Sequence, residues 1–351
     1  MVQAFGPITF GFAALSLAIS AAGVWGSIRI AERVGMMDVP NERSSHSLPV
    51  PRMGGVPMVA AAALAFGGWV LLAANDANVQ RELPYTFLFA LAMFLLGFYD
   101  DLRDLSPLFR FLVQFVSALL LLVFLAPILP DVSLWKWVLP KWAWVVPGAI
   151  WVVWVLNLYN FMDGIDGLAG GEAVVASSFF FLVFAYYGQP GWAVANLVVA
   201  AASMGFLVHN WPPARIFMGD AGSAFLGAFY GMQSVVATLS TPVPFPVLLL
   251  PFANFILDTT FTLFRRMLGG EKWYHAHRSH FYQRMTDLGM THRKVTSIEL
   301  LVVVASCAAA AAYIPAGPVV RIALVIPVVA GIACIGLWVW VKEQALKVRT
   351  G

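Results

Sequence analysis

Residues 143–161 read AWVVPGAIWVVWVLNLYNF and residues 162–167 read MDGIDG, so a long apolar run passes directly into acidic residues and glycines. The run contains no Asp, Glu, Lys or Arg, and it has about the 20 residues that a helix needs to cross the hydrocarbon core of a bilayer. We therefore expect a transmembrane helix that ends at a polar surface.

The whole chain has the composition of a membrane protein. Of its 351 residues, 60% are hydrophobic and only 11% are charged, which leaves too little polar surface to cover a soluble globule of this size. Similar apolar runs recur and predict an all-α polytopic membrane protein of about 11 transmembrane helices in a single domain, 1–351. The predicted spans are 4–25, 54–74, 84–99, 109–129, 143–161, 168–187, 191–208, 221–239, 243–264, 297–314 and 319–341.

The charged residues are divided unevenly between the loops. Alternate loops, with the tail from residue 342, hold 17 of the 21 Lys and Arg and 15 of the 18 Asp and Glu. Because Lys and Arg are enriched in cytoplasmic loops, we expect this set to be cytoplasmic, the N-terminus to lie outside and the C-terminus to lie in the cytoplasm. That rule does not cover acids, whose asymmetry indicates an active site on the cytoplasmic face. The small net charge of +3 indicates no nucleic-acid partner. The loops of this set are 26–53, 100–108, 162–167, 209–220 and 265–296.

Adjacent carboxylates follow the third predicted span. Asp100 and Asp101 stand at its end, and Asp104 would share a helical face with Asp100 if the helix continued. The helix dipole opposes acids at a C-terminus, so their placement is unfavourable unless a metal or a proton-transfer role offsets it. An alternative is a solvated helix end.

Another carboxylate, Asp220, stands at the start of the eighth predicted span. It is expected either to cap that helix or to join a metal or phosphate site with Asn210 and Arg215. The glycines beside it favour the second interpretation, because exposed backbone amides and a guanidinium both suit anionic oxygens.

Polar residues recur at intervals of three where the fifth span ends. A helix would place Asn157, Asn160, Asp163 and Asp166 in one stripe at the membrane edge. Such side chains are unfavourable at membrane depth unless they are paired or used, so the stripe indicates a functional surface. The two Asp-Gly steps predict a turn whose backbone can approach a ligand closely.

A histidine-rich segment lies in the largest cytoplasmic loop. On a helix, His277, His280 and Arg284 would share one face. A zinc site is conceivable, but histidines beside arginines and without nearby cysteines favour phosphate binding. Asp258, inside the ninth span, is expected to be structural and to pair with an arginine at 265–266.

The acidic clusters together require a cation. Asp100, Asp101, Asp163, Asp166 and Asp220 at one membrane face would repel one another and any phosphate, and carboxylate oxygens favour Mg²⁺, with Mn²⁺ as its substitute. With basic residues to bind phosphate oxygens, the clusters predict phosphoryl transfer between a soluble donor and a lipid-borne acceptor.

Four segments, in this order, resemble the polyprenyl-phosphate N-acetylhexosamine-1-phosphate transferase family. They are Tyr99-Asp100-Asp101, NLYNFMDGIDGL at 157–168, RIFMGDAGS at 215–223 and His277-Arg278-Ser279-His280. The segment PRMGGVP at 51–57, preceded by DVPNER at 38–43, resembles that family's first cytoplasmic loop.

The resemblance implies that a UDP-linked N-acetylated sugar gives its sugar-1-phosphate to undecaprenyl phosphate and releases UMP. It implies that this occurs at the cytoplasmic face of a bacterial inner membrane, so that the N-terminus is periplasmic. It also implies that Asp220 is the main Mg²⁺ ligand, that Asp100 assists the metal and activates the lipid phosphate, and that Asp101 acts beside it. Whether transfer takes one step or passes through a covalent aspartyl intermediate stays open, and the family implies a homodimer only weakly. The implied substrate-binding residues are Asn157, Asn160, Asp163, Asp166, Asn210, Arg215, His277, His280, Arg284 and Arg52.

Two departures from the family's peptidoglycan branch bear on the substrate. The histidine motif has no three adjacent histidines, and Arg43-Ser44-Ser45-His46 lacks the Arg-Lys pair of that branch's first loop. Both favour the branch that starts O-antigen, teichoic acid or similar glycans over a muramoyl-pentapeptide transferase. The sugar stays open between N-acetylglucosamine and a deoxy relative such as N-acetylfucosamine.

Two other classes of protein compete with a transferase. A polytopic transporter would place ionisable residues near the bilayer midplane, whereas these lie at span ends. A scaffold protein would leave the polar stripes without a purpose.

Overall fold

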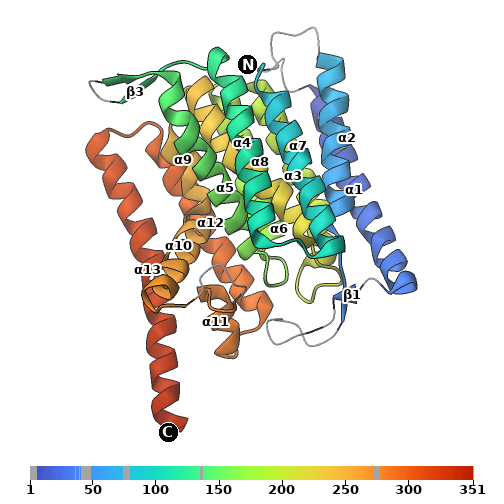
Figure 1. Cartoon of the computed structure of the whole chain (residues 1–351), viewed down its shortest axis with the longest axis vertical. Helices are drawn as coiled ribbons and strands as arrows, with labels where there is room; N and C mark the ends of the chain where they lie inside the picture. The colour runs from blue at the N-terminus through green and yellow to red at the C-terminus, as the bar shows by residue number, and fades with distance from the viewer. Residues whose placement is uncertain are drawn as a thin grey trace.

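The chain folds into a bundle of long helices (Figure 1). The structure, a computed structural model, describes residues 6–35, 37–38, 40, 49–73, 80–134, 137–271 and 277–350, so the Arg43–His46 motif and residues 272–276 of the histidine segment lie outside the described residues. The helices and strands are α1 (Pro7–Val34), β1 (Met37–Asp38), β2 (Val50–Pro51), α2 (Gly55–Ala73), α3 (Leu83–Arg103), α4 (Pro107–Leu125), η2 (Ala126–Ile128), β3 (Val132–Leu134), β4 (Trp137–Leu139), η3 (Lys141–Trp144), α5 (Val145–Phe161), α6 (Leu168–Tyr186), α7 (Pro190–Asn210), α8 (Gly219–Ser240), α9 (Phe245–Leu249), η4 (Leu250–Phe252), α10 (Ala253–Leu268), α11 (Phe281–Asp287), α12 (His292–Tyr313) and α13 (Pro318–Thr350).

Most of these helices have the length and apolarity of membrane spans. Among the described residues ten segments qualify, and α9, η4 and α10 together form one of them. The 22-residue α8 adds an eleventh long helix, in which every residue from Ala221 to Ala237 is buried. Because α8 contacts protein on all sides, it needs less hydrophobic surface than its neighbours do. The predicted all-α polytopic membrane fold is confirmed, and each of the eleven predicted spans corresponds to one of these segments.

Several helices run further than the apolar pattern predicts. α1 continues to Val34 and α3 to Arg103, and each carries an arginine in its last turn. Arginine suits a helix C-terminus, and its long side chain reaches the membrane surface from within a helix. The loops at this end are therefore shorter than predicted, and the 265–296 loop contains α11 and one end each of α10 and α12.

The two described chain ends lie at opposite ends of the bundle. In Figure 1, α1 begins at the end that carries β3 and β4, whereas α13 extends beyond the bundle at the other end. The α3–α4, α5–α6 and α7–α8 connections and α11 lie at the same end as the C-terminus. The motif residues therefore gather at one end, and the assignment of that end to the cytoplasm stays a prediction from the charges.

Glycines allow α8 to pack directly against α3 and α5. A Cβ on Gly97 of α3 would lie 2.3 Å from the carbonyl oxygen of Asp220, and one on Gly227 of α8 would lie 2.8 Å from Cα of Leu156 in α5. Small residues at such crossings let helix backbones touch. The end of α3 is thereby held against the beginning of α8.

Candidate active site

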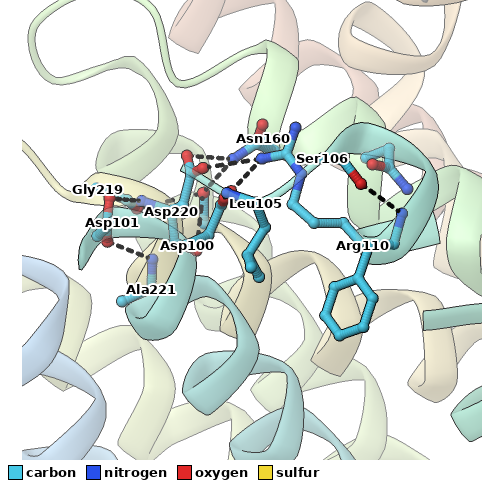
Figure 2. Close-up of polar contacts among 12 residues, drawn as sticks. Asp100, Asp101, Leu105, Ser106, Arg110, Asn160, Gly219, Asp220 and Ala221 are labelled. Atoms are coloured by element: carbon cyan, nitrogen blue, oxygen red, sulfur yellow. Dashed lines mark hydrogen bonds and ion pairs between the residues drawn. The ribbon is translucent and has the colours of Figure 1, made fainter. Parts of the chain in front are cut away.

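Asp101 of α3 caps the N-terminus of α8. Its Oδ1 accepts a hydrogen bond from the amide of Asp220 and its Oδ2 from the amide of Ala221, both at 3.0 Å (Figure 2). Gly219, the first residue of α8, has φ of +77°, and a Cβ there would lie 2.9 Å from Asp101 Oδ2. The positive end of the α8 dipole thus stabilises an acid that the C-terminus of α3 disfavours.

The side chain of Asp220 turns away from that cap. Arg110 of α4 donates through Nη1 to Asp220 Oδ2 at 3.1 Å and also to Asp100 Oδ2 (Figure 2). Asp100 is buried, and its Oδ1 accepts from the amide of Leu105 at 2.7 Å. Of the two predicted roles for Asp220, capping is therefore wrong, and one guanidinium holds together two carboxylates from different helices.

Amide side chains of α5 complete this cluster. Asn160 Nδ2 donates to Asp220 Oδ1 at 2.8 Å and to Ser223 Oγ at 2.9 Å. One turn earlier, Asn157 Nδ2 donates to Gln114 Oε1 at 2.8 Å. A cavity of about 20 Å³, the size of one water or one ion, lies between these groups. Its polar lining consists of Asp100, Arg110, Gln114, Asn157, Asn160 and Asp220, and we call it the carboxylate cavity.

Asp163 lies just beyond the end of α5, close to the same carboxylates. Its enclosure by protein, together with the negative charges of Asp220 and Asp101, raises its pKa well above the usual value. A carboxyl group held in this way is neutral at higher pH than an ordinary aspartate. Because α5 ends at Phe161, the predicted four-residue stripe is helical only at Asn157 and Asn160.

Asp166 and Asn210 join two loops rather than face the cavity. Asp166 accepts from the amide of Ala214 at 3.0 Å and lies 3.0 Å from His292 Nδ1, while Asn210 Oδ1 accepts from the amide of Gly167 at 2.9 Å. Burial raises the pKa of Asp166, but the hydrogen bonds from His292 and Ala214 outweigh it and lower the pKa overall. Both residues thus fix the α5–α6 and α7–α8 connections.

α3 ends too soon for Asp104 to share a helical face with Asp100. Asp104 is its C-cap, with φ of +48°, and is exposed, so it does not share a helical face with Asp100. A left-handed residue ends the helix before the second acid could align with the first.

His280 is the N-cap of α11, and a residue of α10 holds it in place. Asp258 accepts from the amide of Phe281 at 2.9 Å and lies 3.2 Å from His280 Nδ1. Asp258 also accepts hydrogen bonds from the hydroxyl of Thr262 and the amide of Tyr282, so its described hydrogen bonds join α10 to α11 and include none from the predicted arginine. Because α11 starts only at Phe281, the predicted helical face shared by His277, His280 and Arg284 is wrong.

The histidine segment nevertheless lies beside the end of α5. Tyr282 Oη donates to the carbonyl of Phe161 at 2.9 Å, and the ring of His280 stacks 6.2 Å from that of Phe161. The ring of His277 lies 4.9 Å from that of His280. Burial, and then the nearby His280 and the arginines at 265–266, lower the pKa of His277 to about 4, so His277 is neutral near pH 7.

The three predicted arginines have different positions. Arg284 is buried and donates from Nε to Glu343 Oε1 at 2.6 Å, so it faces α13 and not the carboxylate cavity. Arg52 lies 3.6 Å from Asp38, and it is near enough to Asp101 for their opposite charges to attract each other. Arg215 is exposed.

The oxygen atoms at the carboxylate cavity are of the kind that bind Mg²⁺. Within the described ranges no three His, Cys, Asp or Glu side chains form a metal-binding group. Mg²⁺, however, is commonly bound by one or two carboxylates together with water and substrate phosphates. Asp220 and Asp100, both now neutralised by one arginine, fit such a site.

Several residues of this site are absent from the sequence-based prediction. Arg110 and Gln114 stand in the apolar segment PLFRFLVQF, at 107–115, and a helical reading would have placed both near one face at i and i+4. Ser223 stands one turn after Gly219 within the glycine-rich motif. For His292 we find no signal in the sequence.

Comparison with known proteins agrees with this geometry. Residues 83–238, from the start of α3 to the last turn of α8, match the family described as glycosyl transferase family 4. A probable undecaprenyl-phosphate N-acetylglucosaminyl 1-phosphate transferase of Bacillus subtilis is 31% identical over 278 residues, 76% of this chain and 74% of the relative.

Two further relatives extend the similarity. A decaprenyl-phosphate N-acetylglucosaminephosphotransferase of Mycobacterium tuberculosis is 30% identical, with 91% of this chain and 86% of the relative covered. The undecaprenyl-phosphate alpha-N-acetylglucosaminyl 1-phosphate transferase of Escherichia coli is 25% identical, with 76% and 73% covered. The chain therefore belongs to glycosyl transferase family 4, the polyprenyl-phosphate N-acetylhexosamine-1-phosphate transferases that its motifs resemble.

Proposed function

We propose that this protein transfers N-acetylglucosamine-1-phosphate, or the 1-phosphate of a deoxy relative such as N-acetylfucosamine, from a UDP-sugar to undecaprenyl phosphate. The relatives are named for a polyprenyl-phosphate acceptor and an N-acetylglucosamine phosphate group. The observation that carries the proposal is the convergence of Asp100, Arg110, Asn160 and Asp220 on one small cavity at the end of the bundle that holds the motif loops.

The reaction exchanges one phosphoanhydride bond for another, while the ester bonds to the sugar and the lipid stay intact. An oxygen of the lipid phosphate forms a bond to the phosphorus of the sugar-1-phosphate, and the bond from that phosphorus to the oxygen of UMP breaks. The products are a lipid-diphosphate sugar and UMP. Such transfers depend on positioning and on stabilising negative charge, which the polar lining of the carboxylate cavity can supply.

Mg²⁺ held by Asp220 with Asp100 would neutralise phosphate charge. Arg110, which then has fewer carboxylate charges to balance, can donate to phosphate oxygens. Asp100 is placed to accept the remaining proton of the lipid phosphate or to orient its oxygen. Asn157 and Asn160 supply amide donors, and the neutral His277 beside the end of α5 can contact the sugar or diphosphate.

The substrates agree with the predicted orientation. The lipid acceptor is confined to the membrane and the UDP-sugar to the cytosol, so the reaction belongs at the cytoplasmic end of the spans. A product of this kind would start a lipid-linked surface glycan such as O-antigen or a teichoic acid.

The test is to incubate purified protein with undecaprenyl phosphate, Mg²⁺ and single UDP-sugars while measuring UMP. We expect release with UDP-N-acetylglucosamine or UDP-N-acetylfucosamine, and little with UDP-muramoyl-pentapeptide. Release with the pentapeptide donor alone would assign the protein to the peptidoglycan branch. No UMP from any donor would overturn the transferase proposal and leave the transporter, whose test is donor movement in sealed vesicles.

A further inference from the structure

α13 lies at the edge of the bundle (Figure 1). Two grooves are lined by different residues of this helix. In one of them, α11, α12 and α13 enclose a volume of about 710 Å³. Its lining is mostly apolar and includes Met285, Leu288, Ile298, Ile335 and Trp338, and we call it the α12–α13 groove. Ligand pockets in proteins commonly have volumes of about 300 to 1,000 Å³.

The other groove has a similar apolar character. It encloses about 500 Å³ between α10, α11 and α13, and we call it the α10–α13 groove. Leu257, Phe261, Leu337 and Trp340 contribute to its lining. Apolar surface of this kind is expected wherever a membrane helix packs loosely, so apolarity does not distinguish the two grooves.

Charge does distinguish them. Lys294 and Lys342 line the α12–α13 groove, both are exposed, and within the described residues neither side chain makes an ion pair or a hydrogen bond. The cations of the α10–α13 groove are already engaged, because Arg284 pairs with Glu343 and Arg265 donates to a backbone carbonyl at 3.1 Å. Of these two grooves, only the α12–α13 groove therefore offers cationic side chains that have no described partner.

Each of the two lysines stands near one end of a candidate membrane span, where lipid headgroups are expected. Lys294 is in the first turn of α12, at the end of the bundle that carries the motif loops. Trp338 and Lys342 are one turn apart on α13, on the same helical face. Tryptophan favours the headgroup interface, and lysines on the cytoplasmic side attract anionic lipids.

We propose that the α12–α13 groove binds one anionic glycerophospholipid, with an acyl chain along the apolar lining and the headgroup phosphate between Lys294 and Lys342. This lipid is separate from the substrate, because the groove shares no lining residue with the carboxylate cavity. The site does not depend on the proposed function, since its ligand takes no part in transfer.

Native mass spectrometry of the full-length protein can count bound lipids. We expect the protein to retain one phosphatidylglycerol in preference to phosphatidylcholine. Removing two interfacial lysines in Lys294→Gln/Lys342→Gln should weaken that retention about 30-fold. Lys141→Gln, at the opposite end of the bundle, removes a charge of the same type and should leave retention unchanged.

A second variant tests the groove without changing its charge. Ile335→Trp should fill the apolar part and displace the lipid while both lysines remain. Unchanged retention in both groove variants would overturn the proposal. So would preferential retention of undecaprenyl phosphate at this site, or a dimer that dissociates in the lysine variant with no loss of phosphatidylglycerol, since a second copy would then cover the groove.

Discussion

The carboxylate cavity and the histidine segment were both predicted from clusters of polar residues, yet the side chains of the two regions make different kinds of contact. At the cavity, Asp100, Asp220 and Asn160 stand on three helices that close packing holds together, and their polar atoms meet. In the histidine segment, His280 contacts Asp258 and Arg284 pairs with Glu343. A polar residue in a motif can therefore serve the reaction or hold a short helix in place. The residues that it contacts in the structure show which of these roles it has.

The largest effect should come from removing charge at the cavity. We expect Asp220→Asn and Asp100→Asn each to lower turnover by about 10³-fold or more, because each removes a carboxylate from the proposed metal and phosphate site. UMP release by detergent-purified protein measures this, with the unfolding midpoint as a check of folding.

Asp104→Asn is the matched control, since Asp104 belongs to the same motif but is exposed at the end of α3. It should retain turnover within about twofold, as expected of a surface substitution. Equal losses in all three variants would show that turnover depends on the total negative charge at this end of the bundle and not on the carboxylates of the cavity.

Arg110 should rank next. Arg110→Met leaves Asp100 and Asp220 facing each other without their shared cation. We expect about a 10²-fold loss of turnover and a larger rise of the unfolding midpoint on adding Mg²⁺ than in the wild type, because the metal would relieve the repulsion. An equal Mg²⁺-dependent rise in both proteins would argue against a metal at these carboxylates.

The histidine segment should respond in stability rather than in turnover. Arg284→Met removes the ion pair between Arg284 and the partly buried Glu343, and we expect a loss of about 2 kcal/mol in the free energy of unfolding. Arg284→Met/Glu343→Met should recover most of that loss. Turnover per folded molecule should change less than about threefold. A 100-fold loss of turnover in the stable double variant would return Arg284 to the substrate site.

The sequence predicted the spans well because length and apolarity alone define them. It also predicted that Asp100 and Asp220 meet, since both stand where spans end on one side. The capping role of Asp101 depends on the register of α3 on α8, which the close approach at Gly97 sets and no local pattern records. Likewise, the prediction that Arg284 shares a helical face with the two histidines was wrong. The start of α11 depends on Asp258, a residue of another helix.

The smallest predicted effect concerns His277. Its pKa is lowered to about 4 from an unfolded value of about 6.5, so the unfolded chain binds more protons between these pH values. Stability contributed by the neutral ring is therefore present above about pH 6.5 and is lost as the pH falls towards 4. The unfolding midpoint of the wild type should fall more than that of His277→Asn between pH 7 and pH 5, by no more than about 2 °C for a side chain that is partly exposed. Because the ring is already neutral at pH 6 to 8, the pH profile of kcat/KM should show no inflection in that range that His277→Asn removes. Such an inflection would mean that substrate or metal raises the pKa of His277, and would place the ring in direct contact with phosphate.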